Sequence, residues 1–403
     1  MRVLRQVMER GNKLMEKKKV FNVTGLCIPK LHYMVDVSDK VEYIVHEYIE
    51  QDAYFTINRA RQYGKTTMLE LLYNRLKKDY IVLDISFESA DDCFVSMHSL
   101  ALGFINKVYD ALLLNDVPQT LLDLWEKPVS QELPLDGLSR KITELCKKSE
   151  REVILMVDEV DRAADNQLFL MFLGLLRTKY LRRSTGRDYT FKSVILAGVH
   201  DIKNLKMKLR PEENHNYNSP WNIAAVFDVD MTFSADEIAT MLVEYEQDNK
   251  TGMDIKNMSA EIFYYTGGYP FLVSCLCKKM DDEHRDWTCE DLRLSVRDIL
   301  RENNTLFDDV IKNIKNNKDF SALIERIIVS GAQVMYEIRN PLIDLGVMYG
   351  ILKEQDGKAV VSNIIFETVI LNYYTSVRAT NALMSTEYAD RSIYIQDGRR
   401  GEV

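Results

Sequence analysis

The sequence predicts an α/β fold with a parallel sheet, followed by a helical region and a small C-terminal module. Three observations support this prediction. Strand-like and helix-like segments alternate up to about residue 232, where the strand-like segments stop. Residues 153–157 form an unbroken apolar run, which is typical of a strand buried on both faces of a parallel sheet. The chain of 403 residues is long enough for two or three domains.

The elements of the first half follow from apolar runs and helical periodicity. Residues 21–36 contain Gly25 and Pro29 and are expected to be irregular, and residues 40–49 to be helical. Strands are predicted at 54–57, 80–86, 153–157 and 191–199, with a weaker one at 225–229. Helices are predicted at 64–78, 94–113, 121–125, 134–148 and 166–180.

The second half is predicted to be mainly helical. Ser234 and Glu237 have the spacing of a capping box, which opens a helix over 234–245. Further helices are expected at 259–265, 270–280, 289–304, 306–315, 320–329 and 338–345. A hairpin around Asp356-Gly357 (347–353 and 358–361) and a helix over 364–374 complete the outline of a winged helix.

Bulk composition excludes several classes of protein. The formal net charge of −9 disfavours binding to nucleic acid or anionic membrane over the surface as a whole, although a local basic patch would act differently. The sequence has no apolar stretch of about 18 residues and no signal-peptide core, so we expect no membrane association. The 6 cysteines are scattered, as expected of free thiols in a reducing cytoplasm.

The segment that joins the first strand to the first helix resembles a phosphate-binding P-loop. Gly64-Lys65-Thr66 opens the helix, Lys65 would contact the outer phosphates of a nucleotide, and Thr66 would bind Mg²⁺. Arg59 stands where the usual pattern has its first glycine, and Arg59 and Arg61 either clamp phosphates or face solvent. The candidate nucleotide-binding residues of the loop are Arg59, Ala60, Arg61, Gln62, Tyr63, Gly64, Lys65, Thr66 and Thr67.

A second motif follows the apolar run 153–157. Asp158 and Glu159 end a buried parallel strand, the place where α/β proteins bind ligands. This is the Walker B pattern, in which Asp158 would hold Mg²⁺ and Glu159 would act on the water that attacks the γ-phosphate. Two adjacent acids in this place repel each other, so a purely structural role is disfavoured.

Other residues are weaker candidates. His200, with Asp201 as second choice, ends the strand next to the Walker B strand, where it would either sense the γ-phosphate or cap the next helix. Arg182, Arg183 and Arg187 either supply an arginine finger to a neighbouring subunit, as in a homo-oligomer, or form a solvated loop.

Together these motifs predict an α/β P-loop NTPase with a helical lid and a C-terminal winged-helix domain. The expected parts are a basic leader (1–20), the P-loop NTPase domain (21–232), the lid (233–316), a winged-helix-like domain (317–375) and a flexible tail (376–403). The leader is either a solvated segment or a nucleic-acid-binding arm.

Several stretches of the sequence resemble the bacterial AAA-like ATPases, close to archaeal-type ATPases of the STAND class. The resemblance rests on three stretches, which are 62–67, 158–161 and 267–271 (Gly-Gly-Tyr-Pro-Phe). It implies that the first P-loop glycine is often replaced, that Pro270 lies against adenine and that 33–36 contacts the base from the other side. Longer relatives carry a nuclease-like domain after the winged helix, which is not expected here.

The sequence therefore predicts an ATP-binding, Mg²⁺-dependent ATPase that acts as a nucleotide-dependent switch. The alternative is a nucleotide-binding module without turnover, whose winged helix binds DNA or a protein partner. The second helix of the winged helix carries Arg339 but also Asp344, which favours a protein partner.

Overall fold

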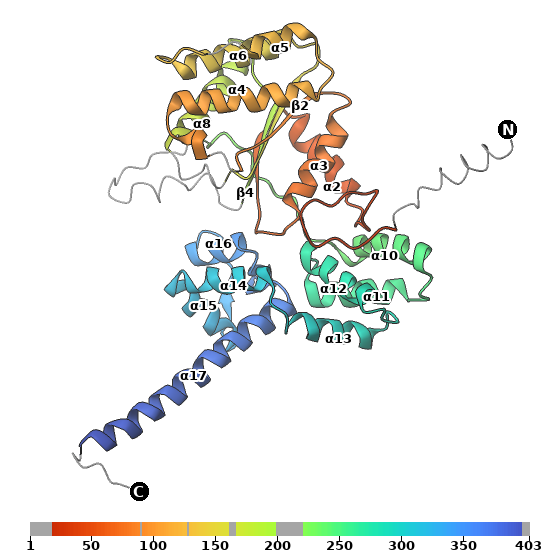
Figure 1. Cartoon of the computed structure of the whole chain (residues 1–403), viewed down its shortest axis with the longest axis vertical. Helices are drawn as coiled ribbons and strands as arrows, with labels where there is room; N and C mark the ends of the chain where they lie inside the picture. The colour runs from red at the N-terminus through yellow and green to blue at the C-terminus, as the bar shows by residue number, and fades with distance from the viewer. Residues whose placement is uncertain (1–17, 89–90, 127–128, 161–166, 199–220, 397–403) are drawn as a thin grey trace, which may run out of the picture.

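The chain folds into an α/β domain followed by two helical parts (Figure 1). The computed structural model describes residues 18–88, 91–126, 129–160, 167–198 and 221–396, with side chains as far as residue 382. The α/β domain lies at the top of Figure 1, helices α10 to α13 lie below it on the right, and α14 to α16 lie below it on the left.

The α/β domain alternates strands and helices, as predicted. Its elements are α2 (Ser38–Ile44), the π-helix η1 (Val45–Ile49), β1 (Tyr54–Asn58), α3 (Lys65–Leu76), β2 (Ile81–Ser86), the 3₁₀-helix η2 (Asp91–Phe94), α4 (Met97–Leu113), α5 (Gln119–Glu126), α6 (Pro134–Lys148), β3 (Val153–Asp158), α8 (Gln167–Arg183) and β4 (Ser193–Gly198).

The four strands form a parallel sheet in the order β1-β4-β3-β2. Phe55 lies opposite Ile195, and Ser86 lies opposite Asp158. The carboxyl ends of the strands therefore meet along one edge, which carries the polar residues predicted at the strand ends. The predicted α/β fold is confirmed.

The weak strand predicted at 225–229 does not form. Only Ala225 pairs with the sheet, through a single bridge to Phe55. Beyond it, side chains take the backbone groups that a ladder would need. The hydroxyl of Tyr48 donates to the carbonyl of Val226 at 3.0 Å, and Arg59 donates to the carbonyl of Val229 at 2.9 Å.

Two apolar cores cover the two faces of the sheet. One joins the sheet to α4, α5, α6 and α8, and includes Phe104, Trp125 and Phe172. The other joins the opposite face to α2 and α3, and continues without a break through the later helices as far as Phe366 and Tyr374. The α/β domain and the helical parts therefore share one core.

The second half contains eight helices and a small sheet among the described residues. Its elements are α10 (Ala235–Asn249), α11 (Ile255–Thr266), α12 (Pro270–Asp282), α13 (Cys289–Ile299), α14 (Thr305–Lys315), α15 (Lys318–Ile328), β5 (Val334–Met335), α16 (Pro341–Met348), β6 (Leu352–Gln355), β7 (Lys358–Val361) and α17 (Ile364–Gln396). The capping box at Ser234 and Glu237 forms as predicted.

Several helix ends differ from the prediction for local reasons. Helix α13 ends at Ile299 rather than 304, because Asn304 caps α14 by accepting from the amide of Leu306 at 2.9 Å. Helix α16 begins at Pro341 rather than 338, since Asn340 caps it through the amide of Leu342.

The closing helix was predicted to end at 374, but α17 continues to Gln396 and extends away from the rest of the molecule (Figure 1). The sequence has no glycine or proline between 364 and 397 to stop it, so polarity alone was a poor guide to its end.

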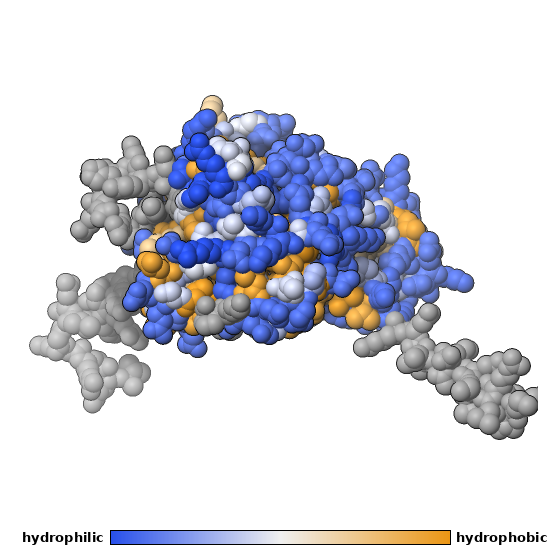
Figure 2. Space-filling model, turned by 90° about the horizontal axis from the view of Figure 1, so that it is seen from above, coloured by the Kyte–Doolittle hydropathy of each residue, from blue (hydrophilic) through white to orange (hydrophobic). Residues whose placement is uncertain are grey.

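The surface is mixed in character. Figure 2 shows the molecule from above, where hydrophilic residues cover most of the surface and apolar residues form separate patches. Within the described residues, no helix combines the length and apolarity that a membrane span requires.

Gly268, in the turn between α11 and α12, lies close to Phe233, just before α10. Its φ is +72°, and a Cβ atom at this position would lie 2.0 Å from the carbonyl oxygen of Phe233. The amide of Phe233 in turn donates to the carbonyl of Gly268 at 2.8 Å. Only glycine fits this contact.

We therefore expect Gly268→Ala to lower the free energy of unfolding by about 2–4 kcal/mol, since alanine adds both a clash and an unfavourable φ. Gly174→Ala is the matched control. Gly174 lies within α8 with open space around it, so alanine should raise the free energy of unfolding by about 0.5–1 kcal/mol. Denaturant unfolding of the full chain measures both, and an unchanged midpoint for Gly268→Ala would contradict the prediction.

Candidate functional site

The loop between β1 and α3 has the backbone form of a phosphate-binding loop. Helix α3 begins at Lys65, and the residue that caps it, Gly64, has a left-handed conformation with φ +79°. Gln62 also has positive φ, at +56°. The amides of the first turn of α3 have no partners inside the helix, and a helix N-terminus of this kind attracts an anion.

The side chain of Lys65 is hydrogen-bonded to the backbone of this loop. Its Nζ donates to the backbone carbonyls of Arg59 and Ala60, at 2.9 Å each. The ammonium group is therefore held against the backbone of the loop. A phosphate bound there would lie next to a fixed positive charge.

The two predicted motifs meet through one hydrogen bond. The hydroxyl of Thr66, at the start of α3, donates to Oδ2 of Asp158, at the end of β3, over 2.9 Å. Oδ1 of Asp158 accepts from the amide of Glu159 at 2.8 Å. The residues are 92 positions apart in the chain, so the parallel sheet is what brings them together.

Glu159 has an uncommon backbone conformation, with φ +54°. Residues other than glycine rarely adopt left-handed φ, and such residues concentrate at functional sites. The side chain of Glu159 is exposed at the carboxyl edge of the sheet, next to Asp158. No sequence pattern indicated this strain.

The two loop arginines lie in different surroundings. Arg59 donates to the carbonyls of Asn58 and Val229 at 2.9 Å each, and its guanidinium lies 5.4 Å from the ring centre of Phe227. Burial lowers the pKa of Arg59. Arg61 is 73% exposed and lies 3.5 Å from Asp309 of α14.

The remaining charged candidates are placed only in part. His200 and Asp201 lie outside the described residues. Arg183 donates to the carbonyl of Lys192 at 3.0 Å and pairs with Asp52 at 3.0 Å, so its guanidinium has a structural role.

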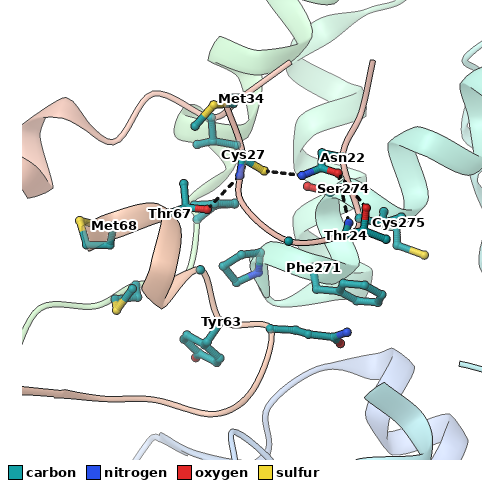
Figure 3. A pocket seen from close by; sticks show the side chains of 18 of the residues that line it. Asn22, Thr24, Cys27, Met34, Tyr63, Thr67, Met68, Phe271, Ser274 and Cys275 are labelled. Carbon is teal, nitrogen blue, oxygen red and sulfur yellow. Dashed lines mark hydrogen bonds between the residues drawn. The ribbon is translucent and has the colours of Figure 1, made fainter. Parts of the chain in front are cut away.

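A cavity of about 620 Å³ opens beside the loop. It lies between the segment 22–37, the start of α3 and the helix α12, and Figure 3 shows side chains from all three turned toward it. Its lining includes Tyr33, Met34, Tyr63, Gly64, Thr67 and Pro270. A Cβ atom on Gly64 would lie 3.8 Å from Pro270, so the loop and the start of α12 are in contact.

Sequence analysis missed Asp84. It lies on β2 opposite Met156 of β3, on the same side of the sheet as Asp158. Desolvation, together with the negative charges of Asp158 and Glu70, raises the pKa of Asp84 from 3.8 to about 6. A lone acid within the apolar strand 80–86 was the only signal in the sequence.

Most of the chain matches a known protein family. Residues 32–370 match the family model described as an AAA-like domain. The chain belongs to this family. The match covers the α/β domain and the helical parts of the AAA-like chain as far as the first turns of α17.

Solved structures are similar to this chain at low sequence identity. The Walker-type ATPase of Pyrococcus abyssi is 14% identical with a TM-score of 0.51, over 87% of this chain and 99% of that chain. The ORC2 protein of Aeropyrum pernix, in ADPNP–ADP complexes, is 11% identical with a TM-score of 0.46, over 89% of this chain and 99% of that chain. No curated protein matches the sequence.

The pKa of Asp84 gives a test of the electrostatics of this edge of the sheet. A carboxyl with a raised pKa in the folded state destabilises the protein once it ionises, so stability is lost as pH rises from about 4 through 6. Asp84→Asn cannot ionise and should be more stable than wild type at pH 8.

Because Asp84 is exposed to solvent, which screens its charge, we expect a gain of only about 1 kcal/mol, which shrinks to nothing near pH 4. Urea unfolding in EDTA across this pH range measures the difference. A difference that does not change with pH would contradict the raised pKa.

Proposed function

We propose that the AAA-like chain binds ATP with Mg²⁺ and hydrolyses it. The observation that carries this proposal is the 2.9 Å hydrogen bond between Thr66 and Asp158, which joins the phosphate-binding loop to the end of a buried parallel strand. A nucleotide site needs both groups at one point, and the chain folds so that they meet there. The related fold in Pyrococcus abyssi is also described as a Walker-type ATPase.

The cavity beside the loop would take the adenosine part of the nucleotide. Its volume of about 620 Å³ lies within the usual range for small-molecule sites, roughly 300–1,000 Å³. Pro270 and Met34 approach it from opposite elements, α12 and the lead-in segment, so apolar surface is available to a flat base. The triphosphate would then extend over Gly64 toward Lys65.

The residues at the loop also fit a magnesium ion. Mg²⁺ prefers hard oxygen ligands, and in nucleotide sites it takes one or two of them from the protein. The hydroxyl of Thr66 and the carboxylate of Asp158 are such ligands and already face each other. When bound, the ion neutralises charge on the phosphate oxygens.

The side chains of the protein would divide the chemistry between them. Lys65 offsets negative charge on the β- and γ-phosphates. Glu159 accepts a proton from the water that attacks the γ-phosphorus, and the bond to the β–γ bridging oxygen breaks to leave ADP and phosphate. His200 is proposed to contact the γ-phosphate.

Tyr269 would transmit the conformational effect of hydrolysis from the loop to the C-terminal part. Its hydroxyl donates to the carbonyl of Arg61 in the loop at 2.5 Å. Its ring packs edge-on against Tyr63, at 4.7 Å between centroids, and against Phe366 of α17, at 5.2 Å. A change in the loop would therefore reach α17 through one side chain, which supports the proposed switch.

Two variants test the catalytic assignment. Lys65→Ala should abolish ATP binding, because the loop loses its fixed positive charge. Glu159→Gln keeps the shape of the side chain but not the base, so ATP binding should persist while phosphate release falls at least about 100-fold. Calorimetry and a phosphate-release assay measure the two effects.

Two results of these assays would contradict the assignment. Hydrolysis at the wild-type rate would show that Glu159 is not the base. A wild-type protein that binds ATP and releases no phosphate would instead favour a nucleotide-binding module.

A second proposed activity is binding of a protein partner through the winged-helix-like region, and specific observations favour it over DNA. Helix α16 contains no lysine or arginine and carries Asp344 in its first turn. Arg339, just before it, pairs with Glu337 at 3.2 Å. Met335 and Ile338 are 78% and 45% exposed, so apolar surface is available nearby.

We therefore expect no salt-sensitive binding of duplex DNA by the full chain. Protein that contacts several phosphates binds more weakly as salt rises, and α16 supplies no cations for such contacts. Fluorescence anisotropy with a labelled duplex at two salt concentrations, with and without ATP, gives the answer. Binding that weakens steeply with salt would overturn the preference for a protein partner.

A further inference from the structure

A second cavity lies between the α/β domain and the C-terminal part, apart from the one proposed for adenosine. Its volume is about 660 Å³. One wall comes from β1 and the segment 225–232, another from the end of α11, and the third from α16 and the small sheet. Figure 1 shows α16 below β4 at this boundary. The second cavity therefore brings together three parts of the chain.

The second cavity also borders the phosphate-binding loop. Arg59 and Ala60 line it, and Tyr63 lines both this cavity and the one beside Gly64. A ligand in the second cavity would therefore contact the loop and still leave the adenosine cavity open.

Carboxylates outnumber cations in the lining of the second cavity. Its charged residues are Asp228, Asp230, Asp344, Glu354, Arg59 and Lys353. The guanidinium of Arg59 already donates to the carbonyls of Asn58 and Val229. An excess of negative charge disfavours a phosphate or a nucleic acid in this cavity and favours a cationic ligand.

Two of these carboxylates, on opposite walls, are oriented by neutral donors. Oδ1 of Asp230 accepts from the amide of Thr232 at 2.9 Å and from its hydroxyl at 2.8 Å. Oε1 of Glu354 accepts from the amide of Gly357 at 2.6 Å. Neutral donors hold both side chains in place and leave their negative charge unchanged.

Apolar side chains accompany the charges. Val226, Phe263 and Ile338 line the second cavity, are exposed to solvent, and come from three different walls. Among the described residues, no group of acidic, histidine and cysteine side chains is arranged to hold a metal ion. A ligand with both cationic and apolar side chains would use all of these features, whereas a simple cation would use only the charges.

We propose that the second cavity binds a short basic segment of a partner protein, whose arginine or lysine side chains meet the carboxylates and whose apolar side chains cover Val226, Phe263 and Ile338. This inference rests on the proposed binding of a protein partner and deepens it, by naming the chemistry of the partner and the place where it binds. The volume lies within the usual range for small-ligand sites, roughly 300–1,000 Å³, so it suits a short segment and not a folded domain.

The test uses two fluorescein-labelled hexapeptides, one of alternating leucine and arginine and one of alternating leucine and glutamate. Fluorescence anisotropy measures their binding to the full chain, and only the arginine peptide should bind. Asp230→Asn and Glu354→Gln each remove one charge and keep the shape of the side chain. Each should weaken binding of the arginine peptide about two- to fivefold, and the double variant about four- to twenty-five-fold.

A matched control removes the same charge elsewhere. Asp110 on α4 and Glu150 after α6 are exposed, and neither lines the second cavity. The double variant Asp110→Asn/Glu150→Gln should bind the arginine peptide as wild type does. Thermal melting confirms that each variant is folded.

The outcomes separate this inference from the proposal on which it rests. The inference is overturned if wild type does not bind the arginine peptide, or if the control weakens binding as much as Asp230→Asn/Glu354→Gln does, because overall charge would then explain it. Salt-sensitive binding of duplex DNA would instead overturn the preference for a protein partner.

Discussion

Three consecutive residues in the turn between α11 and α12 join the parts of this molecule, and the geometry of the site depends on them. A Cβ atom on Gly267 would lie 2.6 Å from the carbonyl of Ser362, and one on Gly268 would collide with Phe233. Tyr269 then bonds to the loop through Arg61. The absence of side chains at Gly267 and Gly268 lets this turn pack against the backbone of Ser362 and Phe233. The next residue, Tyr269, connects the turn to the loop. Pro270 reaches the cavity because these contacts place it there.

The same packing accommodates an arginine in place of the first glycine of the usual P-loop pattern. The backbone at Arg59 does not adopt positive φ, so the conformational freedom of glycine is not needed there. The side chain turns out of the loop toward Phe227 and the carbonyl of Val229. It donates to a backbone carbonyl that a fifth strand would have used.

The sequence was sufficient for the parallel sheet and for the order of its elements, because unbroken apolar strands and helical periodicity are local properties. It also assigned Thr66 and Asp158 to one site, as ligands of the same Mg²⁺, since strand ends in a parallel sheet share one edge. Residues 22–27, most of which line the cavity beside the loop, were not predicted as part of the site. The bonds that Asn22 and Thr67 make to this segment span a turn and a gap of 40 residues, and neither leaves a periodic pattern. Asp84 was missed for a similar reason, because its importance depends on the neighbouring strand.

The apolar core that runs from the sheet to α17 also limits how the parts can move. Ile195 of β4, Leu272 of α12 and Phe366 of α17 belong to the same buried cluster. A wide hinge opening would expose this apolar surface to water, which is unfavourable in proportion to its area. Small sliding displacements between packed helices keep such surface covered. The continuous core therefore favours shear over hinge motion between these parts.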